Sequence, residues 1–75
     1  MGAEYDQHAP LPPHYAFVVQ WASDTQIEAG RIHGRVEHVV SRQATRFTSL
    51  EELLAFMARV LREVAAREHA AEADV

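Results

Sequence analysis

The amino-acid sequence predicts a small α+β domain, in which a two- or three-stranded antiparallel sheet precedes one C-terminal amphipathic helix that covers one sheet face. Three observations support this fold class. A chain of 75 residues is long enough for one domain only. Residues 15–47 carry apolar side chains in the patterns of strands, whereas residues 50–64 repeat them at helical spacing. Hydrophobic residues make up 48% of the chain, which is enough to drive folding.

Residues 1–14 are expected to form a flexible arm, because their three prolines favour an extended backbone. Such an arm can be a proline-rich ligand for an aromatic groove, although a disordered leader is the simpler interpretation. We expect the single domain to span residues 15–67 and the alanine-rich, acidic residues 68–75 to form a frayed tail.

The first predicted strand covers residues 15–22, which are rich in aromatic and β-branched side chains. One face carries Tyr15, Phe17, Val19 and Trp21, and the alternate positions are also mostly apolar. A strand that is apolar on both faces needs cover on both.

A polar loop leads to a second predicted strand over residues 31–40, whose even-numbered positions are the more apolar. If Ser41-Arg42 makes a two-residue turn, residues 43–47 return as a short third strand. The pairs predicted by this register are Val36 with Phe47 on the inner face and Glu37 with Arg46 on the outer face.

The C-terminal helix is predicted to begin at two overlapping capping boxes, Thr48 to Glu51 and Ser49 to Glu52. Apolar side chains then follow at helical spacing and form one wide stripe. These are Leu50, Leu53, Leu54, Phe56, Met57, Val60, Leu61 and Val64.

One helix covers one face of a sheet, so part of the apolar strand surface is expected to stay open. Burying a large apolar side chain is worth about 1.5–3 kcal/mol, which matters for a small, marginally stable domain. We therefore expect a homodimer, formed by pairing of sheet edges or by packing of the open faces. The candidate interface residues are Phe17, Val19, Trp21, Val39 and Phe56.

The net charge of −4 is unevenly distributed, with −4 on residues 1–30, +3 on residues 31–47 and −3 on residues 48–75. The arginines of the basic middle are candidate contacts for an anion or a nucleic acid, although a solvated strand face is the simpler interpretation. Nucleic-acid binding is disfavoured, because the aromatic side chains are needed in the core and the whole chain is acidic. The candidates are Arg31, Arg35, Arg42 and Arg46.

The residue types for common chemistries are missing or badly spaced. The chain has no cysteine, which excludes disulfides, thiolate zinc sites and cysteine nucleophiles. His33 and His38 are five apart on one strand and point to opposite faces, so they do not chelate one ion. Without a glycine-rich phosphate loop or a hydroxyl beside a credible base, the sequence predicts no catalytic residue, cofactor or metal.

No run of about 18 apolar residues is present, so no membrane span is expected. The acidic, proline-bearing N-terminus does not resemble a signal peptide, which leaves a cytoplasmic location as the expectation. All basic residues apart from histidine are arginines and alanine is abundant, a composition typical of GC-rich bacterial genomes.

The stretches GRVEHVVS (residues 34–41) and RFTSLEELLAF (residues 46–56) resemble a group of short bacterial proteins described as hypothetical. The resemblance covers residues 15–64 and implies no activity. In element order alone, the chain is similar to small antitoxins with a partial RNase-H-like fold.

The leading hypothesis is therefore a non-enzymatic, homodimeric association module that serves as an accessory or adaptor subunit in a bacterial cytoplasmic assembly. The alternative is an antitoxin-like or nucleic-acid-binding regulator that uses residues 31–46.

Overall fold

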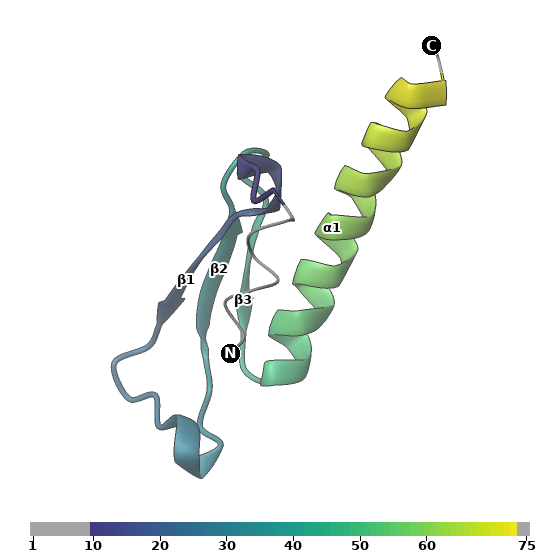
Figure 1. Cartoon of the computed structure of the whole chain (residues 1–75). Helices are drawn as coiled ribbons and strands as arrows, with labels where there is room; N and C mark the ends of the chain where they lie inside the picture. The colour runs from purple at the N-terminus through teal and green to yellow at the C-terminus, as the bar shows by residue number, and fades with distance from the viewer. Residues whose placement is uncertain (1–9, 74–75) are drawn as a thin grey trace, which may run out of the picture.

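The computed structural model describes residues 10–73, with side chains for residues 10–70 (Figure 1). The elements, in chain order, are η2 (Pro13–Tyr15), β1 (Phe17–Trp21), η3 (Ile27–Ala29), β2 (Gly34–His38), β3 (Ala44–Phe47) and α1 (Leu50–Ala73).

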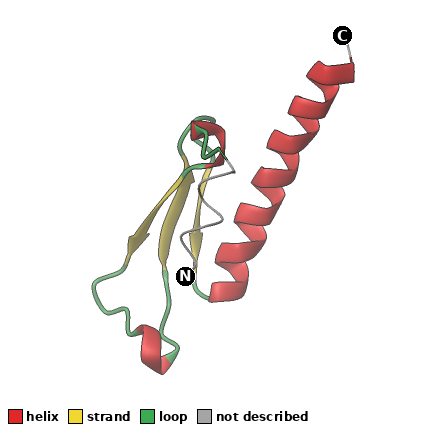
Figure 2. Cartoon of the chain, in the orientation of Figure 1, coloured by secondary structure: helices red, strands yellow, loops and turns green. Residues whose placement is uncertain are grey.

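The strands form one antiparallel sheet in the order β1-β2-β3, and α1 packs on one face of it. The helix contacts mainly β3, β2 and η2, so it lies over the β3 side of the sheet and leaves β1 at the far edge (Figure 1). Figure 2 shows these two layers, with the strands beside a single long helix. The predicted α+β arrangement, three strands followed by one helix, is confirmed.

The turn between β2 and β3 is longer than the sequence predicts. Residues 39–42 form it, and the Arg42 amide donates to the His38 carbonyl over 2.9 Å. Arg42 closes the turn with φ 69°, in the left-handed region that glycine usually occupies. The predicted two-residue turn at Ser41-Arg42 is therefore wrong.

The longer turn moves the register of β2 against β3 by two residues. Both predicted pairs are wrong, because Val36 lies opposite Thr45 and Arg46 lies opposite Arg35. A shift of two residues leaves every side chain on its predicted face. The inner face therefore stays apolar although the pairs across it change.

The core lies between α1 and the face of the sheet toward the helix. Its most buried side chains come from β2, β3 and one stripe of α1, and Phe17, Val19, Ile32 and Met57 pack against them partly buried. The buried core residues are Val36, Phe47, Leu53, Phe56, Val60 and Val64.

Gly34 lies in the middle strand where two aromatic side chains meet over it. It pairs with Trp21 on one side and with Phe47 on the other. The Trp21 and Phe47 rings make an edge-to-face contact with centroids 5.6 Å apart. A Cβ atom at Gly34 would overlap the Gln20 carbonyl oxygen, so the approach of the β1 backbone to β2 requires glycine here.

The helix begins at the second of the two predicted capping boxes, but the reciprocal bond of that box goes to Thr48, one residue before the N-cap Ser49. The Glu52 amide donates to Ser49 Oγ over 3.1 Å, and the Glu52 carboxylate accepts from the Thr48 amide over 2.7 Å. The helix continues to Ala73, past residue 67 where the sequence placed the end of the domain. Alanine is the strongest helix former, which accounts for the extension over this alanine-rich segment.

Candidate functional site

The exposed apolar side chains of β1 are divided between the two faces of the sheet, because Val18 is 55% exposed on the face opposite the helix while Trp21 lies beside the helix. Phe17, Val19 and Trp21 of β1 all point to the side of the sheet that carries α1, but only the first two pack against the core. Trp21 remains 44% exposed, although it also touches Phe47. The expectation that an uncovered back face carries these residues is thereby corrected.

The other two predicted interface residues are not part of this surface. Phe56 is only 7% exposed and belongs to the core, where its ring meets the Phe17 ring edge-on at 6.3 Å. Val39 is exposed, but it lies in the turn after β2. The structure divides the helix stripe into a buried and an open part.

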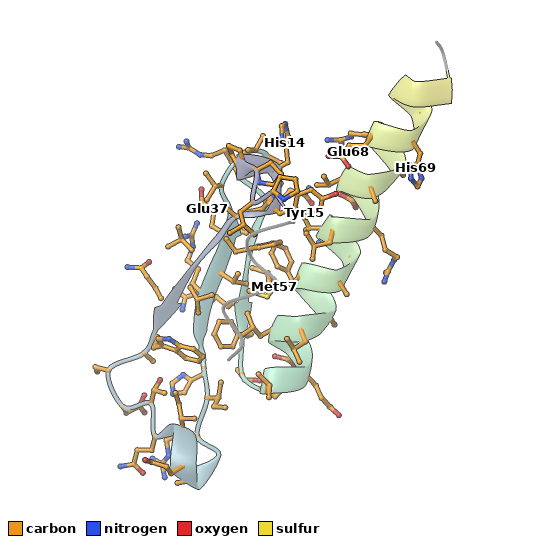
Figure 3. All side chains as sticks on the ribbon, viewed as in Figure 1. His14, Tyr15, Glu37, Met57, Glu68 and His69 are labelled. Carbon is orange, nitrogen blue, oxygen red and sulfur yellow. The ribbon has the colours of Figure 1, made fainter. Side chains whose placement is uncertain are left out.

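We call the open part of the stripe the helix flank, and it consists of Leu50, Leu54, Met57 and Leu61. These positions repeat every three to four residues and therefore lie along one side of α1. Leu50 and Leu54 are about half exposed, at 49% and 54%, while Met57 and Leu61 are partly buried. The labelled Met57 in Figure 3 lies between the helix and the sheet, where the flank borders the core.

One hydrogen bond places the helix flank on the side of η2, the segment that leads into β1. Glu68 lies on the same side of the helix as the flank, two turns beyond Leu61. Its Oε1 accepts a hydrogen bond from the hydroxyl of Tyr15 over 2.9 Å (Figure 3). Tyr15 is the last residue of η2, two residues before β1 begins, so the helix flank and the chain leading into β1 meet here. The same hydrogen bond, with burial and the charge of the carboxylate, raises the pKa of Tyr15 above its usual value of 10.0.

The opposite side of the helix is joined to Gln43, the residue that precedes β3. Gln43 donates from Nε2 to Glu63 Oε1 over 3.1 Å, and Arg59 forms an ion pair with Glu63 over 3.1 Å. The Gln43 hydrogen bond and the nearby arginines hold the pKa of Glu63 below its usual 4.5. These contacts fix the helix over β3, which explains why β1 is left uncovered.

The outer edge of β1 has unpaired backbone groups. Ala22 donates to the His33 carbonyl over 2.9 Å, and Val39 donates to the Ala16 carbonyl over 3.1 Å. Because bonded positions alternate in an antiparallel ladder, the even-numbered residues of β1 bond to β2. The amides and carbonyls of the odd-numbered residues therefore point to the edge, where the described residues place no further strand. They belong to Phe17, Val19 and Trp21.

The two edges of the sheet differ in their protection against pairing. β1 contains neither a charged residue nor a proline between Phe17 and Trp21. β3 carries Arg46, and the groove between its edge and α1 is also lined by Arg59 and Arg62. Charges at an edge strand oppose the addition of another strand, so the edge of β1 is the less protected of the two.

A buried histidine, considered from the sequence only as a metal ligand, joins three segments. His38 is 2% exposed, and its Nε2 donates to the His14 carbonyl over 2.7 Å. Its Nδ1 accepts from the Ser41 hydroxyl over 2.7 Å, and that hydroxyl in turn accepts from the Gln43 amide over 3.3 Å. These hydrogen bonds connect the turn after β2 to η2. His38 and Ser41 together therefore close the turn and position the start of β1. The spacing His-x-x-Ser at the end of a strand was the available signal.

The four candidate arginines do not form one patch. Arg35 and Arg42 share one carboxylate, Glu37, at 3.1 Å and 3.3 Å. Arg46 lies opposite Arg35 on the outer face. Arg31 lies apart from them, in the loop closed by its bridge to Gln26.

Neither a metal-binding cluster nor a membrane-spanning helix is present in the described part of the chain. Among residues 10–70, no group of three or more histidine or acidic side chains is arranged to hold a metal ion. The described helices include none with the length and apolar character needed to cross a bilayer. Comparison with protein-family models, curated proteins and solved structures finds no match.

Proposed function

We propose that this protein is a non-enzymatic association module that forms a homodimer through the edge of β1. The observation that carries the proposal is the combination, on one five-residue strand, of unpaired edge groups and the half-exposed Trp21. A second copy has the same pattern of groups at its β1 edge. The unpaired amides and carbonyls of each chain can therefore bond to those of the other.

The spacing of the edge groups sets the register of the dimer. In an antiparallel pair with its two-fold axis at Val19, Phe17 of one copy lies opposite Trp21 of the other, and Val19 lies opposite Val19. Each of these positions has its amide and carbonyl directed outward. Every edge donor of one strand then meets an edge acceptor of the other, and the two sheets become one six-stranded sheet.

The same register also extends the apolar surface. Phe17, Val19 and Trp21 lie on the helix side in both copies, so the paired strands form a continuous apolar floor between the two helix flanks. Direct cross-strand pairs of aromatic residues contribute about 0.2–1 kcal/mol each beyond an alanine pair. The exposed Trp21 ring gains cover from the Phe17 ring of the second copy.

Sedimentation equilibrium at micromolar concentrations tests this proposal. We expect a mass twice the chain mass of 8.4 kDa, with dissociation on dilution. A single species of 8.4 kDa that unfolds cooperatively across this concentration range would contradict it.

A further inference from the structure

The outer face of the sheet contains a row of hydrogen-bond donors that the association surface does not use. Gln20 of β1 lies opposite Arg35 of β2, and Arg35 lies opposite Arg46 of β3. The three side chains cross the full width of the sheet on the face that α1 leaves open.

The two arginines occupy the position where cross-strand side chains come closest. The even-numbered residues of β2 bond to β3, as the His38 amide does to the Gln43 carbonyl over 2.8 Å. Arg35 and Arg46 are therefore a non-hydrogen-bonded pair, for which the Cα atoms are only about 4.5 Å apart. Like charges directly opposite each other destabilise a sheet.

The nearby carboxylates do not neutralise this pair. Glu37 accepts from Arg35 Nη1 over 3.1 Å but also from Arg42, and Asp24 is held by His33 Nε2 over 2.7 Å. Within the described residues, Arg46 has no ion-pair partner. The guanidinium of Arg46 and the remaining donors of Arg35 are thus available to an anion.

These side chains line a hollow in the outer face. Its volume is about 350 Å³, and Gln20, Arg35, Arg46 and His33 are among its lining residues. Gly34, which lies between His33 and Arg35 in the chain, also lines the hollow.

We propose that this hollow binds one phosphate-monoester group, with Arg35 and Arg46 each donating a pair of hydrogen bonds and the Gln20 amide donating another. The planar guanidinium fork matches phosphate oxygens, and a dianion cancels the repulsion between the two arginines. This site is independent of the association at the β1 edge.

The arrangement favours a single phosphate over the backbone of a nucleic acid. Glu37 and Asp24 lie near the hollow and would repel phosphates that extend past it. Arg31 and Arg42 do not continue the row, since the first lies in a loop and the second in a turn. The net charge of −4 also weakens the attraction of a polyanion.

Titration with inorganic phosphate at constant ionic strength, followed by NMR, tests the site. We expect saturable shifts at the Arg35 and Arg46 side chains, and about a tenfold or greater loss of affinity in Arg46→Gln. Arg62→Gln removes an exposed helix arginine and is the matched control, so it should bind phosphate as the wild type does. Without phosphate, Arg46→Gln should melt at a higher temperature than the wild type because the like-charge pair is gone.

Three results would overturn the proposal. The first is the absence of saturable shifts in the hollow, and the second is an equal loss of phosphate binding in Arg46→Gln and Arg62→Gln. The third is tighter binding of a single-stranded oligonucleotide in the hollow, with affinity that falls steeply as salt rises, because that result identifies a phosphodiester site.

Discussion

Replacing Gly34 with alanine is expected to remove most of the folding stability of the protein. The added Cβ would overlap the Gln20 carbonyl oxygen and lie 3.0 Å from the Trp21 Cα atom, and both belong to the backbone of β1. A backbone cannot rotate away as a side chain does, so the β1–β2 ladder must open at this end and the Trp21–Phe47 contact is lost. We expect a loss on the order of 3 kcal/mol in the free energy of unfolding, measured by urea denaturation at a fixed protein concentration.

Gly30→Ala is the matched control for this prediction. Gly30 has φ 79°, but no atom lies within 4 Å of the position of an added Cβ. Its replacement should therefore cost only the backbone strain, about 1 kcal/mol. If Gly34→Ala were no less stable than Gly30→Ala, the close approach of β1 to β2 would be wrong.

Val19→Pro is expected to separate association from folding. The Val19 amide points to the outer edge of β1, so proline there removes no hydrogen bond to β2. At the two-fold axis the proline removes both hydrogen bonds between the paired Val19 residues, worth about 1 kcal/mol each. Its ring also projects between the two paired β1 strands. We expect roughly 100-fold weaker dimerisation by sedimentation, with the circular dichroism spectrum of a folded chain.

Two further proline variants control for position. Ala44→Pro places proline on the outer edge of β3, which is the edge flanked by arginines, and should leave dimerisation unchanged. Gln20→Pro removes an amide that bonds to β2 and should unfold the chain. Equal loss of the dimer in Val19→Pro and Ala44→Pro would contradict the assignment of the interface to β1.

The strands and the helix could be predicted from the sequence because their side-chain periods are strong. The pattern of residues 31–40 identified Val36 and His38 as inward-facing, and both are buried. The register failed because it depends on the turn. Arg42 adopts a left-handed backbone conformation, which arginine rarely does. The four-residue turn could therefore not be predicted from the residue types.

The sequence correctly predicted that an apolar surface stays uncovered, but it placed that surface on the wrong part of the sheet. Sequence periodicity showed more apolar surface than one helix covers, and the half-exposed Trp21 and Leu54 agree with that excess. Which part stays open depends on where the helix crosses the sheet. That position is set by Gln43, which bonds to Glu63 and joins α1 to β3, a contact between residues 20 apart in the chain. No local pattern encodes such a contact.

Hydrogen exchange of the backbone amides of Phe17, Val19 and Trp21 tests the central claim most directly. If β1 pairs with a second copy, these amides exchange slowly and their protection increases with protein concentration. The Ala44 and Arg46 amides, on the free edge of β3, should exchange fast at every concentration. Fast exchange of the three β1 amides at all concentrations, or protection that does not change with concentration, would contradict pairing of β1 between two chains.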